Sequence, residues 1–118
     1  MKVKTQENVN KMVLRDLNQA LSETFNDYQG SYFFGSRAKG VLNTDSDFDI
    51  VFLFNELNFA KKLCIAGIVG DIEYQYNIFI DYKLFTMAGT KSIEHIRRYV
   101  NPYFVHEAID QGIFYGRQ

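Results

Sequence analysis

The chain has 118 residues, 47% of them apolar and 16% aromatic, which is enough for one domain with a hydrophobic core and too little for two. Its net charge of −1 argues against sequence-independent binding to DNA or RNA, because proteins that bind in that way are usually strongly basic. No apolar run approaches the ~18 residues of a membrane span, and no signal peptide is expected, so we expect a cytoplasmic protein. A single cysteine, Cys64, excludes an internal disulfide, and we expect its side chain to be buried in a helix.

The N-terminal half is predicted to form one helix and two strands. Apolar residues recur at intervals of three and four over about 5–27, which predicts an amphipathic helix that ends at Tyr28-Gln29-Gly30. Apolar runs at 31–34 and 47–54 predict two strands, separated by a Gly-Ser turn and a brief loop.

The next part of the chain is predicted to form a helix and a third strand. The helix is expected over 55–69, with an asparagine cap at its start and Gly70 at its end. Lys61 and Lys62 are expected on its solvent-facing side. The third strand is predicted at about 72–85, where apolar and aromatic residues dominate.

Two further helices are predicted near the C-terminus. One begins at Thr90 or Ser92 and continues to about residue 100, and the last begins at Pro102, because proline suits the first helical position, and ends at Gly112. Residues 113–115 either add a short strand or cover a sheet edge.

Two aspartates and a Gly-Ser turn are the first candidates for a functional site. Asp47 and Asp49 are two residues apart, so on a strand both carboxylates leave the same face, roughly 6.5–7 Å apart along the chain. This suits them to flank one or two divalent cations, since paired ions in phosphoryl-transfer sites lie about 3.5–4 Å apart. Gly35 and Ser36 offer backbone N–H groups and a hydroxyl, which are the donors that a phosphate needs. Together these features indicate nucleotide chemistry.

The spacing of these residues resembles a known family. Ser36, ten further residues and Asp47-Phe48-Asp49 match the Gly-Ser-x10-Asp-x-Asp signature of the DNA polymerase β-like nucleotidyltransferase superfamily. The stretch from Gly35 to Gly40, Gly-Ser-Arg-Ala-Lys-Gly, is similar to its minimal nucleotidyltransferase (MNT) branch, in which Arg is commoner at the position of Lys39. Lysine keeps the positive charge there but loses the bidentate geometry of arginine.

Asp81 is a third acidic candidate. It lies in the middle of a strongly strand-forming run, where a carboxylate is costly unless it is paired, hydrogen-bonded or bound to a metal. The resemblance implies a third carboxylate on the strand beside the Asp-x-Asp strand, and Asp81 is its natural candidate. Asp71 and Glu73 are less suitable because they lie at the predicted helix-to-strand turn. Lys83 shares the face of Asp81 and is either solvated or in contact with a triphosphate.

The resemblance also implies a fold and a mechanism. The fold would be α/β over a single domain, 1–118, with a small mixed or antiparallel sheet and helices packed mainly on one face. Asp47, Asp49 and Asp81 would hold two Mg²⁺ ions. Gly35, Ser36, Arg37 and Lys39 would bind ATP or another nucleoside triphosphate, from which a nucleoside monophosphate passes to an acceptor hydroxyl.

The acceptor stays open at this stage. MNT proteins are often encoded beside a helical HEPN-type toxin and act as its antitoxin, so the resemblance implies AMP transfer to such a partner. One alternative is a binding module with an inactive site that neutralises a helical partner by contact. Another is a small-molecule (antibiotic) nucleotidyltransferase that works as a homodimer.

Overall fold

The computed structural model describes residues 6–40, 47–87 and 101–117, in which helices and strands build the expected α/β fold. In chain order the elements are α1 (Gln6–Thr24), β1 (Tyr28–Phe34), α2 (Gly35–Ala38), β2 (Phe48–Phe54), α3 (Phe59–Tyr76), β3 (Ile80–Thr86), α5 (Pro102–Val105), the short π-helical turn η1 (His106–Asp110) and β4 (Ile113–Gly116). The helix expected from Thr90 or Ser92 to about residue 100 lies outside the described residues. No helix within the described ranges is both long enough and apolar enough to cross a membrane.

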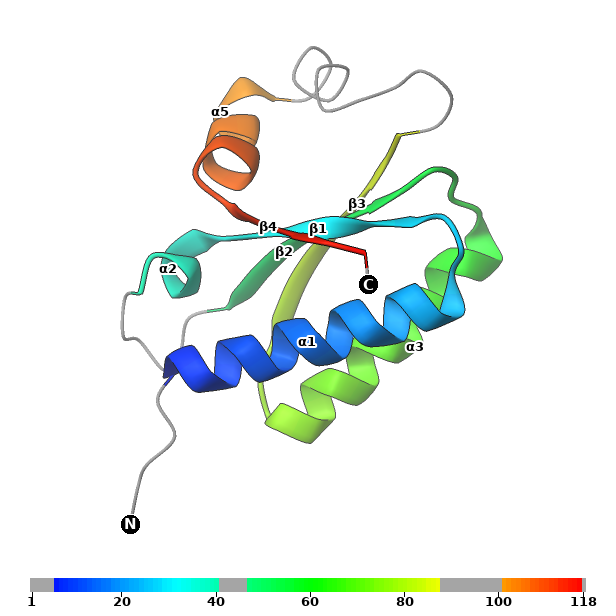
Figure 1. Ribbon diagram of the computed structural model, residues 1–118, viewed down its shortest axis with the longest axis horizontal. Coiled ribbons are helices and arrows are strands. Elements are labelled where there is room, and N and C mark those ends of the chain that lie inside the picture. The colour runs from blue at the N-terminus through cyan, green and yellow to red at the C-terminus, as the bar shows by residue number, and fades with distance from the viewer. Residues whose placement is uncertain (1–5, 41–46, 88–100, 118) are drawn as a thin grey trace.

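The four strands form one mixed sheet in the order β3-β2-β1-β4 (Figure 1). β1 is antiparallel to both β2 and β4, whereas β2 and β3 run parallel, with α3 as the crossover between them. The tail over 113–116 therefore adds a strand to the sheet, which was one of the two expectations for it. The last helix begins at Pro102 as predicted, with the Asn101 side chain accepting from the backbone N–H of Tyr103 at 2.8 Å.

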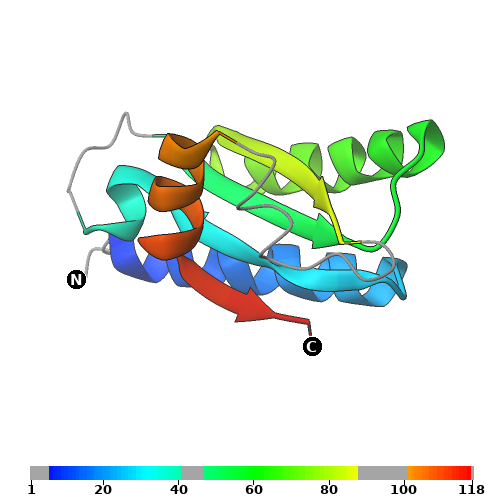
Figure 2. The ribbon, with the colours of Figure 1, turned by 90° about the horizontal axis from the view of Figure 1, so that it is seen from above.

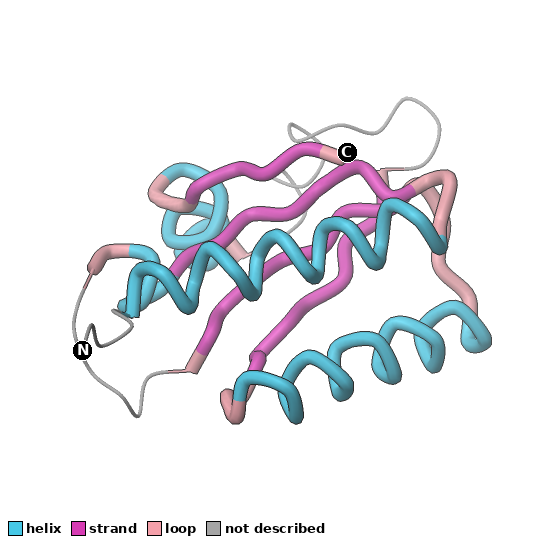
Figure 3. The backbone as a smooth tube through the Cα atoms, turned by 60° about the horizontal axis from the view of Figure 1, so that its bottom comes forward, coloured by secondary structure: helices cyan, strands magenta, loops and turns pink. Residues whose placement is uncertain are grey.

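Helices cover the two faces of the sheet unequally. The long helices α1 and α3 both lie against one face, while the short α5–η1 segment lies over the other, as Figures 1 and 2 show. The tube in Figure 3, in which this face of the sheet is turned towards the viewer, shows the same two long helices side by side in front of the strands. The expectation of helices packed mainly on one face is confirmed.

Alternation along β2 separates two apolar clusters. Phe48, Ile50, Phe52 and Phe54 pack into the main core with α1 and α3. Val51 and Leu53 point the other way, into a smaller cluster under α5 and η1. Only Asp49 interrupts an otherwise fully buried strand.

The first helix and first strand meet earlier than predicted. α1 ends at Thr24, and Tyr28 to Gly30 belong to β1 instead of terminating the helix. The reason is tertiary: the Tyr28 ring is fully buried and packs 5.4 Å from the ring of Phe54. Gly30 has φ of 139° beside a register shift in the β1–β2 ladder, a conformation that favours glycine.

The boundaries predicted for the next helix and strand were wrong. α3 starts after Asn58, whose side chain accepts from the backbone N–H of Lys61 at 2.8 Å, and it continues to Tyr76. Asn77 ends it in the left-handed conformation (φ 52°, ψ 51°), so Gly70 lies inside the helix. Residues 72–76 are thus helical, and the third strand is shorter than the predicted 72–85.

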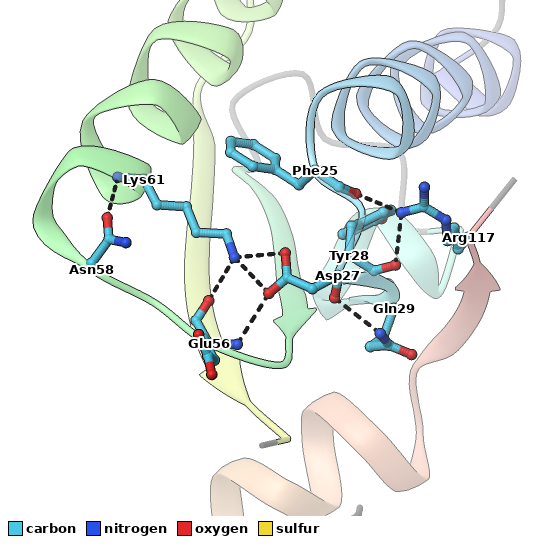
Figure 4. A network of polar contacts seen from close by, with 8 residues as sticks. All are labelled: Phe25, Asp27, Tyr28, Gln29, Glu56, Asn58, Lys61 and Arg117. Atoms are coloured by element: carbon cyan, nitrogen blue, oxygen red, sulfur yellow. Dashed lines mark hydrogen bonds and ion pairs between the residues drawn. The ribbon is translucent and has the colours of Figure 1, made fainter. Parts of the chain in front are cut away.

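Two side-chain expectations on α3 were also wrong. Cys64 is exposed, because Ile65, Val69 and Ile72 form the inward face of the helix. Lys61 is not solvated: its side chain is only 14% exposed, and its Nζ donates to Asp27 Oδ1 at 2.6 Å (Figure 4).

Candidate functional site

Asp49 and Asp81 lie side by side on adjacent parallel strands. They are directly paired in the β2–β3 register. Successive side chains of a strand point to opposite faces of the sheet. Ile50 faces the long helices, so the side chain of its neighbour Asp49 lies on the other face, the one that α5 covers. Lys83, two residues beyond Asp81, contacts both Asp81 and an α5 ring, which places Asp81 on that face too. The strand expected to carry the third carboxylate therefore does lie beside the Asp-x-Asp strand.

Asp47 immediately precedes β2 and is exposed. Its charge acts on two residues of the candidate site. It raises the pKa of Asp49, and it partly offsets the lowering of the Arg37 pKa by burial. Asp47 therefore lies within electrostatic range of both the carboxylate pair and the loop that follows β1.

The electrostatics of Asp49 indicate an excess of negative charge. Burial raises its pKa most, and the charges of Asp81 and then Asp47 raise it further, while the ammonium of Lys83 lowers it. Metal ligation by oxygen relieves such repulsion, and carboxylates are the ligands that Mg²⁺ prefers. Within the described ranges, no three Asp, Glu, His or Cys side chains are placed as a ready metal-binding group. The acidic side chains and the pairing of Asp49 with Asp81 suit a divalent cation. The carboxylates would have to move closer together to bind it.

Gly35 joins the Gly-Ser turn to this carboxylate. Its neighbour Phe34 is paired with Asp49 in the β1–β2 register, and Gly35 itself has φ of 84°. A Cβ on Gly35 would lie 2.2 Å from Asp49 Oδ2, which is closer than two non-bonded atoms can approach. Glycine is therefore required twice over, by the backbone conformation and by the contact with Asp49.

Arg37 is hydrogen-bonded to the first helix. It is 8% exposed, and its Nη1 donates to Asn10 Oδ1 of α1 at 3.0 Å, so it fastens the short helix α2 to α1. Ser36, beside it, is half-buried at the start of α2. Lys39 is exposed and its Nζ lies 3.3 Å from Glu107 Oε2 of η1. A lysine in so exposed a pair can exchange its partner at small cost.

A cavity of about 580 Å³ lies behind the same loop, on the side of α1. Asn10, Lys11, Arg37 and Lys39 contribute its polar lining, and β4 contributes Ile113 and Tyr115. None of the three aspartates lines it, so it is separate from the carboxylate pair.

Contacts across long sequence separations could not be inferred from motifs. Asn10 meets Arg37 over 27 positions, and Glu107 meets Lys39 over 68. Phe104 of α5 is a third example: its ring lies 5.6 Å from Phe34 and 5.7 Å from Phe85, which makes an aromatic wall beside the carboxylates. No local pattern in the sequence signals these partners.

The described residues thus form an α/β domain with two carboxylates paired on neighbouring strands. A family model described as a nucleotidyltransferase domain matches residues 14–115, and the chain belongs to that family. A search of curated proteins found no match.

Several of the solved structures that match the chain are toxin–antitoxin complexes. A toxin–antitoxin structure with AMP-PNP matches with a TM-score of 0.59 and 19% identity, covering 94% of this chain and 75% of the other. A mutant of the MntA–HpeT complex with two aspartates changed to glutamate gives a TM-score of 0.59, 18% identity and the same coverage. Another mutant of that complex, with a tyrosine changed to alanine, gives 0.57 and 16%, covering 98% of this chain and 75% of the other. At these identities the likeness shows the fold alone.

Proposed function

We propose that the protein is a metal-dependent nucleotidyltransferase that moves AMP from ATP to an acceptor hydroxyl, as a single domain over 1–118. The observation that carries the proposal is the Asp49–Asp81 pair, in register on adjacent strands and in contact range of the Gly-Ser turn through Gly35. The family match and a structural neighbour crystallised with AMP-PNP support it. In the reaction the acceptor hydroxyl loses its proton to solvent and its oxygen bonds to the α-phosphorus. The bond between the α-phosphorus and the oxygen bridging to the β-phosphorus breaks, and pyrophosphate leaves.

Each site residue has a proposed role. Asp47, Asp49 and Asp81 would hold two Mg²⁺ ions, which neutralise phosphate charge and lower the pKa of the acceptor hydroxyl. Gly35 and Ser36 would donate backbone and hydroxyl hydrogen bonds to the phosphates, and Lys39 would leave Glu107 to contact them. Arg37 would act indirectly, by holding α2 against Asn10.

Transfer of radiolabel tests this proposal. The purified protein, Mg²⁺ and each α-labelled nucleoside triphosphate are incubated with the product of the neighbouring gene. The proposal is supported if label passes from ATP with the wild type and with Asp71→Asn, but not with Asp49→Asn. Asp71 is the control because it is an exposed acid on α3, which packs against the opposite face of the sheet. Equal transfer by wild type and Asp49→Asn, or none by the wild type, would refute it.

We further propose that the chain is an antitoxin that binds a helical HEPN-type toxin. The neighbouring structures are toxin–antitoxin complexes, and the outer side of α3 supports a protein partner. Phe59 is 75% exposed there, Leu63 58% and Tyr74 91%, and exposed apolar side chains gathered on one element are typical of protein interfaces. The neighbouring gene product should co-purify with the wild type and with Lys62→Ala, but not with Leu63→Lys. That result would support the outer side of α3 as the toxin-binding surface. Co-purification unaffected by Leu63→Lys would contradict it.

The second candidate function is a binding module that neutralises its partner by contact alone. The same exposed side of α3 favours it, since α3 covers one face of the sheet (Figure 1) and the carboxylates lie on the other, towards α5. Co-expression with the toxin separates the two functions. Asp49→Asn that still protects cells favours contact alone, whereas loss of protection with the complex still formed favours catalysis.

A further inference from the structure

Lys83 places a positive charge at the carboxylate pair. Its Nζ lies 3.7 Å from Asp81 Oδ1, and both side chains are about half exposed, at 45% and 46%. The same Nζ lies 5.7 Å from the ring centroid of Phe104 on α5. The ammonium is thus placed between a carboxylate on the sheet and an aromatic ring on the helix that covers this face.

The charge of Lys83 also reaches the second carboxylate. It lowers the pKa of Asp49, against burial and the charges of Asp81 and Asp47, which raise it. Lys83 therefore offsets part of the repulsion that two neighbouring carboxylates produce when no metal ion is present.

A divalent cation on Asp81 and an ammonium beside the same oxygen repel each other. Lysine carries its charge on a flexible four-carbon stem, and a half-exposed stem can turn without leaving a buried charge unpaired. Phe104 offers a ring face that interacts favourably with the ammonium as it leaves Asp81.

We propose that Lys83 is the counter-ion of the metal-free site, and that a divalent cation displaces it from Asp81 so that its ammonium binds the phosphates of the incoming nucleotide. This inference rests on the proposed nucleotidyltransferase function and assigns that site a further substrate-binding residue. It requires two opposite effects of removing the charge. Binding of the metal alone becomes tighter, and binding of the metal–nucleotide complex becomes weaker.

Lys83→Met keeps the length and packing of the side chain and removes only the charge. The matched control is Lys62→Met, an exposed lysine of α3, which packs against the opposite face of the sheet. Mn²⁺ binding without nucleotide is followed by electron paramagnetic resonance, and Mg²⁺-dependent binding of a non-hydrolysable ATP analogue by calorimetry. Both variants are first checked for folding by circular dichroism.

We expect Lys83→Met to bind Mn²⁺ about 3–10-fold more tightly and the Mg²⁺–nucleotide about 3–10-fold more weakly, from the loss of one partly screened charge. Lys62→Met is expected to change neither. Unchanged or weaker Mn²⁺ binding by Lys83→Met overturns the counter-ion role, and unchanged nucleotide binding overturns the transfer to phosphate. In both cases the wild type still binds metal and nucleotide, so the proposed function stands. A wild type that binds neither would instead remove the proposed function and this inference together.

Discussion

Replacing Asp49 by asparagine should stabilise the metal-free protein while abolishing Mg²⁺-dependent nucleotide binding. The carboxylate of Asp49 is partly buried beside Asp81 and near Asp47, and its pKa is raised by burial and by those two charges. Asparagine has the same shape without the charge. The substitution removes the repulsion between like charges and the cost of burying an ionised group.

The size of the effect follows from Coulomb's law. Two like charges on adjacent strands, ~5 Å apart at an effective dielectric constant of ~40–80, repel by about 0.8–1.7 kcal/mol. Asp49 has two like-charged neighbours, Asp81 and Asp47, and the opposing effect of Lys83 is smaller than that of either. With solvent screening at this partly open site the net gain is about 1 kcal/mol, or about 3–5 °C in Tm for a chain of this length.

The pH dependence of the Asp49 effect has a defined sign. Because the folded-state pKa of Asp49 lies above its unfolded value of about 3.9, the unfolded chain loses this proton first as pH rises, and the folded state loses stability. The gain from Asp49→Asn should therefore be present at pH 7.5 and shrink towards pH 4.

Thermal unfolding in EDTA, with circular dichroism, measures the effect of Asp49→Asn directly. Asp71→Asn, an exposed acid on α3, is the control and should leave Tm unchanged within about 1 °C. Adding Mg²⁺ and a non-hydrolysable ATP analogue should raise the Tm of the wild type and not that of Asp49→Asn. A metal-free Asp49→Asn that is no more stable than the wild type at pH 7.5 would refute the electrostatic argument.

Three other substitutions test the structure. Gly35→Ala places a Cβ 2.2 Å from Asp49 Oδ2 at φ of 84°. We expect urea titration to show a free energy of unfolding lower by about 1–3 kcal/mol, and calorimetry to show loss of nucleotide binding. At Gly70, in the interior of α3, a Cβ meets nothing within 4 Å, so Gly70→Ala should raise the free energy of unfolding by about 0.5–1 kcal/mol. A similar loss of stability in both variants would contradict this account. Lys61→Met should cost about 1–2 kcal/mol at pH 7, because Lys61 donates to the carboxylate of Asp27. Burial alone would raise the pKa of Asp27, but bonds to Lys61 and a backbone N–H lower it overall, so this loss should shrink as urea titrations move below pH 4. An equal loss at both pH values would be evidence against the ion pair.

The part of the fold that could be predicted is the part encoded by short spacings. The strand, Gly-Ser turn and Asp-x-Asp strand occupy about twenty consecutive residues, and each feature depends on its immediate neighbours. The position of Asp81 beside Asp49 was also predicted, because the resemblance implies a third carboxylate on the strand next to the Asp-x-Asp strand and Asp81 lies inside a strand-forming run.

The boundaries of α3 could not be predicted because tertiary contacts override local preference. Residues Glu73 to Tyr76 are rich in aromatic side chains and resemble a strand, yet Ile65, Val69 and Ile72 bury one helical face against the sheet and extend the helix. Asparagines at both ends, Asn58 and Asn77, provide the caps. Glycine at position 70 looked like a terminator only because the inward face of the helix was unknown.

One face of β2 packs into the main hydrophobic core, and the other carries the candidate site residue Asp49. The β2 residues at even positions all pack against α1 and α3, where Phe48 stacks on Phe33 at 4.5 Å between ring centroids. Those at odd positions face α5, which covers Val51 and Leu53. Asp49 is the odd position nearest the start of the strand, on the face that the long helices do not cover and next to the turn after β1. A charged group can therefore be held rigidly by a buried strand while its own side chain is only partly buried. For this reason, substitutions at even positions should destabilise the fold, whereas Asp49→Asn should abolish ligand binding without destabilising it.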